Sequence, residues 1–87
     1  MLIPAHLKIG GHQVKVIIGK VSDDDAGEWN NCNNSITLNE SMTRSQIESA
    51  FIHEILHVLN SELNHTILDS LAEQLYQVFS DNNLFKE

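Results

Sequence analysis

The sequence is poor in cysteine, in proline and in long apolar runs, and each shortage excludes a class of protein. The single Cys32 cannot form an internal disulfide, which fits a reducing compartment. The single Pro4 leaves no proline-rich linker between domains. No apolar run reaches the length of a membrane span, and the first residues lack the basic and apolar segments of a signal peptide. We therefore expect a cytoplasmic protein.

Basic side chains are also scarce. Five Lys and Arg residues stand against twelve Asp and Glu residues, which gives a net charge of −7. Nucleic-acid binding depends on basic side chains that displace counterions, and docking on an anionic membrane needs the same charge. Neither partner is expected. The 87 residues, of which 41% are hydrophobic, predict one domain over 1–87 with a small core, to which a bound metal would add stability.

Residues 1–40 have mainly the pattern of β-structure. Short runs rich in β-branched residues alternate with turn residues, as strands of a small sheet do. The pair Gly10-Gly11 suits the positive φ angles of a tight hairpin turn, and Asn33-Asn34 would turn a second hairpin. The expected strands are residues 7–9, 14–18, 28–32 and 35–38.

The second half of the chain changes to a helical period, with helices expected over 43–60 and 65–81. Thr43-Arg-Ser-Gln46 has the form of a capping box at the start of the first helix. Strands followed by helices predict an α+β fold, with a small antiparallel sheet made of two hairpins and then two packed helices. The side chains of the second helix expected to point inward are Ile67, Leu68, Leu71, Leu75, Val78 and Phe79.

The first helix contains the motif His53-Glu54-Ile-Leu-His57. A spacing of four residues places both imidazoles on one helix face, where they can bind one zinc ion. Glu54 lies beside that face and can take a proton from a zinc-bound water. A chance match is possible, but a capped helix with apolar residues in every gap favours the metal interpretation. The motif predicts a zinc-dependent peptidase that acts on a peptide or protein substrate.

A catalytic zinc site also needs a third protein ligand. If the helices form an antiparallel hairpin, Asp69 lies level with His57 and Glu73 lies level with His53. Asp69 is then the favoured ligand, while Glu73 would brace the second nitrogen of His53. Glu73 and His65 remain alternatives for the third ligand.

Each of these candidates has a second interpretation that involves no metal. Asp69 could cap the start of the second helix together with Thr66. Glu73 could be a solvated surface side chain, and His65 a histidine in a loop.

The acidic run 23–25 lacks the ligand alternation of a calcium site and predicts a solvated loop.

The motif and its surroundings resemble a known family. The segment 51–57, the helix that follows it and the opening hairpin at 8–16 are similar to small zinc metallopeptidases of phages and prophages, over nearly the whole chain. Those proteins resemble minimal gluzincins, in which a carboxylate on the helix after the motif completes the zinc site. The resemblance implies a minimal zincin-like fold, a phage-encoded protein working in its host cell, and Asp69 or Glu73 as the third ligand, with Asp at 69 where Glu is more usual.

The same resemblance implies that residues 27–38 form the sheet edge beside the cleft, where an extended peptide could add as a further strand. Trp29 and Ile36 could equally serve only to pack the sheet. Two other functions also fit the sequence. One is a catalytically weak or inactive zincin-fold protein that acts as a protein-binding module, and the other is a structural zinc domain with four protein ligands.

Overall fold

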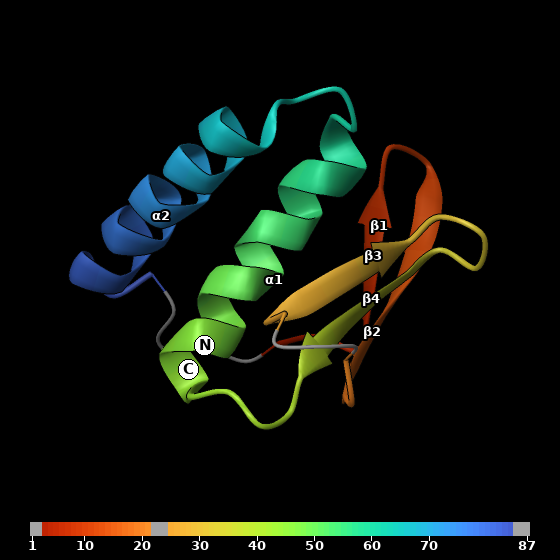
Figure 1. Cartoon of the computed structure of the whole chain (residues 1–87), viewed down its shortest axis with the longest axis horizontal. Helices are drawn as coiled ribbons and strands as arrows, with labels where there is room; N and C mark the ends of the chain where they lie inside the picture. The colour runs from red at the N-terminus through yellow and green to blue at the C-terminus, as the bar shows by residue number, and fades with distance from the viewer. Residues whose placement is uncertain (1–2, 22–24, 85–87) are drawn as a thin grey trace.

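The computed structural model describes residues 3–21 and 25–84, which form a four-stranded sheet followed by two helices (Figure 1). This confirms the α+β class and the order of strands and helices along the chain. The elements are β1 (His6–Ile9), β2 (His12–Gly19), β3 (Gly27–Asn30), β4 (Ser35–Asn39), α1 (Arg44–Leu59) and α2 (His65–Asp81). Asp23 and Asp24, expected in a solvated loop, lie outside the described residues.

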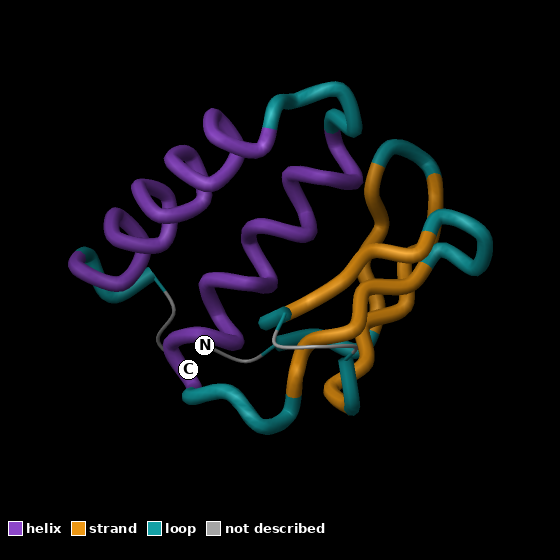
Figure 2. Tube along the Cα trace, in the orientation of Figure 1, coloured by secondary structure: helices purple, strands orange, loops and turns teal. Residues whose placement is uncertain are grey.

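Helix α1 lies between the sheet and α2, so the molecule has three layers (Figures 1 and 2). The main core fills the space between the sheet and α1. Its buried apolar side chains alternate along the two central strands and recur at helical spacing on α1. They are Val14, Val16, Ile36, Leu38, Ile47, Ala50 and Phe51.

Both predicted hairpins are present. Gly10 and Gly11 have φ angles of 55° and 84°, and their two-residue turn joins β1 to β2 in an antiparallel pair. This backbone conformation favours glycine because a Cβ atom is strained there. In the second hairpin β3 already ends at Asn30, and the turn occupies residues 31–34, with Asn34 at a φ of 51°.

The prediction of an entirely antiparallel sheet was wrong where the two hairpins meet. The strand order is β1-β2-β4-β3, and β2 pairs with β4 in parallel. The physical reason lies in the strand compositions. Strand β4 carries the fully buried Ile36 and Leu38 and needs neighbours on both sides, whereas the short, polar β3 tolerates an edge position. As a result β3 lies at the sheet edge and contacts α1.

The capping box predicted for α1 is confirmed. The backbone N–H of Gln46 donates to Oγ1 of Thr43 at 3.3 Å, and the backbone N–H of Thr43 donates to Oε1 of Gln46 at 2.9 Å. Farther along α1 the buried Glu48 joins the two helices. Its Oε1 accepts a hydrogen bond of 2.9 Å from the hydroxyl of Tyr76 on α2, and its Oε2 lies 3.4 Å from Nε of Arg44. This polar contact fixes how far α2 is shifted along α1.

Helix α2 buries a narrower face than the sequence predicted. Leu68 and Ala72 are buried, but Ile67, Leu71 and Val78 are 40–52% exposed. The inward assignment of these three side chains was wrong because α2 packs chiefly against one helix, which covers a seam rather than a wide apolar face. Within the described residues, neither helix combines the length and apolar character required to cross a bilayer.

Candidate metal centre

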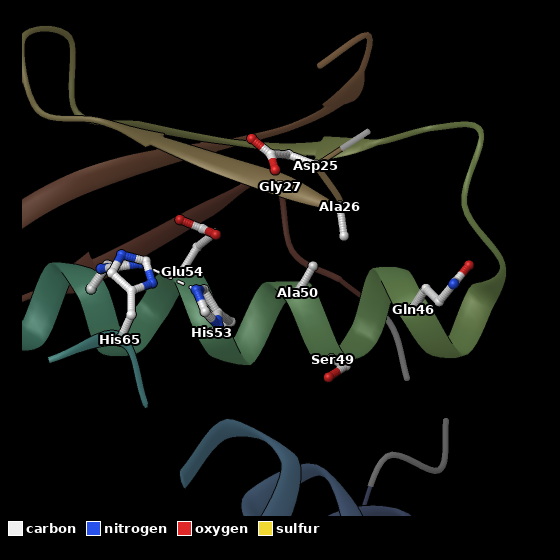
Figure 3. A pocket seen from close by; sticks show the side chains of 10 residues that line it. Asp25, Ala26, Gly27, Gln46, Ser49, Ala50, His53, Glu54 and His65 are labelled. Carbon is white, nitrogen blue, oxygen red and sulfur yellow. Dashed lines mark hydrogen bonds between the residues drawn. The ribbon is translucent and has the colours of Figure 1, made fainter. Parts of the chain in front are cut away.

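One face of α1 and the start of β3 enclose a cleft of about 490 Å³ (Figure 3). The helix supplies side chains every three or four residues, so they form one stripe along α1. The opposite wall is the chain that enters β3, and the first residue of α2 lies at one end. The lining residues are Gln46, Ser49, Ala50, His53, Glu54 and His57 from α1, Asp25, Ala26 and Gly27 from the opposite wall, and His65.

Three imidazoles converge at one end of this cleft. Nε2 of His53 lies 3.1 Å from Nε2 of His57, and the ring centroids of His57 and His65 are 4.8 Å apart. One nitrogen from each ring falls within 4.8 Å of the others. Asn64 holds His65 in place, since its Oδ1 accepts the backbone N–H groups of the next turn and starts α2 at residue 65. These three histidines could hold a metal ion.

Asp69 lies behind this cluster. Its Oδ1 is 3.2 Å from Nδ1 of His53, which leaves Nε2 of His53 facing His57. A carboxylate in this position keeps the proton of His53 on Nδ1 and leaves a lone pair on Nε2 for a metal. The sequence had assigned this bracing role to Glu73, which is exposed and outside the cleft lining.

The helix pair is therefore shifted by about one turn from the predicted register. The prediction placed Asp69 beside His57 and Glu73 beside His53, whereas the structure places His65 beside His57 and Asp69 beside His53. The interpretation of Asp69 as a capping residue is wrong, because Asn64 caps α2. His65 is the first residue of a helix and not a loop histidine.

The electrostatic environment favours neutral imidazoles in the cluster. Burial and the neighbouring His57 lower the pKa of His53, although Asp69 opposes this shift. Burial and His65 likewise lower the pKa of His57, again against the effect of Asp69. Only the neutral imidazole offers a lone pair to a metal. Both motif histidines are thus held in the form that binds a metal ion near neutral pH.

Glu54 lies beside the imidazoles with its side chain 95% buried. Within the described residues its carboxylate has no hydrogen-bond or ion-pair partner, so it is free to engage a bound molecule. Gly27 lies against it, since a Cβ atom at residue 27 would be in ordinary contact with Cγ of Glu54 at 3.4 Å. Burial, reinforced by the negative charges of Asp25 and Glu28, raises the pKa of Glu54 from its ordinary value of 4.5 to about 7.

Comparison with family models, with curated proteins and with solved structures found no match to this chain. The function must therefore be argued from the site itself. The resemblance to phage metallopeptidases stays a hypothesis drawn from the residues.

Several lining residues were not recognised from the sequence. Asp25 was assigned to a solvated loop, Gln46 was assigned only to the capping box, and Ser49 and Ala50 were not singled out. The three residues on α1 lie one and two helical turns before His53, on the same face as the motif. This helical spacing is the signal that could have identified them. The exposed Cys32 lies in the β3–β4 turn and does not line the cleft.

In the metal-free protein, the stability of a Glu54→Gln variant relative to the wild type is expected to increase as the pH rises, because the wild type becomes less stable. The carboxyl has a higher pKa in the folded chain than in the unfolded chain, so its ionisation costs folding free energy between pH 4.5 and about 7. The amide does not ionise. The variant should be more stable than the wild type by on the order of 2 kcal/mol at pH 8.

Urea unfolding of both proteins in chelator at pH 5 and pH 8 measures this effect. The stability gained by substitution should be small at pH 5 and larger at pH 8. An equal gain at pH 5 and pH 8 would show that ionisation of the Glu54 carboxylate does not lower the stability of the folded protein.

Proposed function

We propose that this protein is a zinc-dependent peptidase in which His53, His57 and His65 bind the metal and Glu54 transfers protons. The observation that carries the proposal is the convergence in one cleft of three imidazoles with the carboxylate of Glu54, a residue that is only 5% exposed and has no hydrogen-bond partner among the described residues. The first two histidines and Glu54 follow from the sequence motif. The proposed third ligand, His65, is one of the two alternatives that the sequence left open, in place of the favoured Asp69.

The donor set fits zinc. Two imidazole nitrogens bound tetrahedrally at 2.0–2.1 Å would lie about 3.3 Å apart, and the two Nε2 atoms of His53 and His57 are 3.1 Å apart. Bracing of His53 by Asp69 is the arrangement common behind metal-binding histidines. No fourth His, Cys, Asp or Glu joins this group within residues 3–21 and 25–84. An open fourth position favours a catalytic site over a structural zinc site.

A zinc ion in this position would polarise a substrate carbonyl and lower the pKa of a coordinated water toward neutrality. Glu54 would accept the proton of the attacking water and deliver it to the leaving amine, which completes hydrolysis of the amide. Burial suits Glu54 to both steps, because it raises the pKa of the carboxyl group and so lets Glu54 keep the proton until the amine leaves. Asp69 would keep His53 in the tautomer that binds the metal.

The shape of the cleft favours an extended peptide as substrate. Its lining on α1 runs from Gln46 to His57, which is a length of about 16 Å at helical rise. An extended chain of about five residues covers that length. The opposite wall leads into β3, an edge strand that among residues 3–21 and 25–84 pairs with β4 alone, so one side of its backbone is open to a further strand.

The metal part of the proposal predicts about one zinc ion per chain. The ligands come from both helices, so the ion would tie α2 to α1, and its removal should lower the melting temperature by about 5–15 °C. Elemental analysis of protein purified without added metal, followed by melting with and without chelator, measures both quantities. An unchanged melting temperature in a protein that has lost its metal would contradict the proposed cross-link.

Turnover separates the peptidase from the alternative of a zincin-fold binding module. The metal-loaded protein should cleave members of a mixed library of unstructured peptides, and chelation should stop the cleavage. A protein that binds zinc at three histidines but cleaves nothing in that library would favour the binding module.

A further inference from the structure

The part of the cleft lining that the structure describes carries carboxylates and no Lys or Arg side chain. The carboxylates are those of Asp25 and Glu54. Asp25 lies on the wall opposite α1, two residues before Gly27 (Figure 3). Asp25 and Glu28 both interact electrostatically with Glu54, so the field of the β3 wall reaches the proposed reacting end of the cleft.

Four further lining residues, Ala26, Gly27, Ser49 and Ala50, are small and uncharged and do not neutralise this field. A zinc ion at the three histidines would add positive charge at the end of the cleft that they occupy, so a cationic group would be drawn toward Asp25 and away from the metal. Glu54 is 95% buried, lines the cleft and lacks a hydrogen-bond partner among the described residues. A cleft with walls of low polarity concentrates the field of the charges that line it. A cationic group that enters the cleft would therefore be attracted more strongly than on an open surface.

We infer that the cleft selects peptides that carry a cationic group close to the bond held at the metal centre, and that Asp25 is the residue that binds this group. The inference rests on the proposed peptidase function. The group is an ammonium or a guanidinium, and it has two possible sources. It is either the side chain of a Lys or Arg residue or the free amino terminus of a short peptide.

The test uses peptides that differ only in charge. Each quenched fluorescent peptide carries Lys, Gln or Glu beside the cleaved bond, in one version with a free amino terminus and in another with an acetylated one. Cleavage efficiency and binding, by fluorescence anisotropy, are measured on the metal-loaded wild type and on Asp25→Asn. The substitution keeps the hydrogen bond from the Asn39 amide, because the acceptor is the backbone carbonyl of Asp25. Glu40→Gln, which removes one exposed charge outside the cleft, is the matched control.

The wild type is expected to prefer cationic over anionic peptides, and Asp25→Asn to reduce this ratio about two- to fivefold, as for one exposed charge pair. Added salt should reduce it as well. Glu40→Gln should leave the ratio unchanged. A preference that follows the Lys residue, or one that follows the free amino terminus, supports the inference and identifies the source of the charge.

An unchanged ratio in Asp25→Asn, or an equal loss in Glu40→Gln, would overturn the inference. Comparing ratios within each variant removes any general effect of Asp25 on the rate through Glu54. The two proposals also fail separately. Cleavage without charge preference would overturn the role of Asp25 and leave the peptidase function standing, whereas charge-selective binding without cleavage would do the opposite.

Discussion

Replacing His65 by alanine is expected to weaken zinc binding by more than a hundredfold. His65 would supply one of three protein ligands, and its ring lies within 4.8 Å of that of His57. Asp69→Ala should cost less, about ten- to a hundredfold, because Asp69 contacts His53 and would act only through it. Competition titration against a chromophoric chelator measures both affinities.

Glu73→Ala is the matched control for these two variants. Glu73 is an exposed carboxylate on the same helix, outside the cleft lining, so its loss should leave the zinc affinity unchanged. The cap of α2 survives in all three variants because Asn64 provides it, and circular dichroism checks this. If Asp69→Ala proves more damaging than His65→Ala in folded protein, the carboxylate is the ligand, as the sequence favoured.

Glu54→Gln is expected to lower peptide cleavage by about a hundred- to ten-thousandfold, the usual contribution of a general acid–base residue. The amide has nearly the same shape as the carboxylate and fits beside Gly27, but it cannot accept the proton of the attacking water. Zinc content should be unchanged, because Glu54 is not among the three grouped ligand side chains. Initial rates and metal analysis on the same sample measure both quantities.

The control for this variant is Glu62→Gln, which changes an exposed carboxylate in the loop between the helices and should leave the rate unchanged. A Glu54→Gln protein that no longer holds zinc would show that Glu54 is a ligand. A variant that keeps full activity would remove Glu54 from the proposed mechanism.

The features that the sequence predicted correctly are local ones. The capping box of Thr43 and Gln46 and the turn at Gly10-Gly11 each depend on residues within four positions of one another. The helix face shared by His53 and His57 follows from their spacing alone. In these cases the backbone geometry of a single element determines the outcome, so neighbours in the sequence carry the information.

The features that the sequence did not determine depend on how separate elements pack. Both possible orders of β3 and β4 satisfy the same hairpin and the same alternation, and only burial of Ile36 and Leu38 between neighbouring strands distinguishes them. The register of the helices depends on where α2 begins, and the Asn64 cap and the contact of Glu48 with Tyr76 set it. A shift of one turn was enough to place His65 where Asp69 was expected, and Asp69 where Glu73 was expected.

The three histidines lie closer together in the chain than the two central strands do. His53, His57 and His65 span about a dozen residues, whereas the pairing of β2 with β4 joins residues about twenty positions apart, such as Val16 and Ile36. Shorter loops close at lower entropic cost and form contacts sooner. A refolding chain can therefore bring its imidazoles together before β2 pairs with β4, and the wall that carries Asp25 and Gly27 would then close over a metal that is already bound.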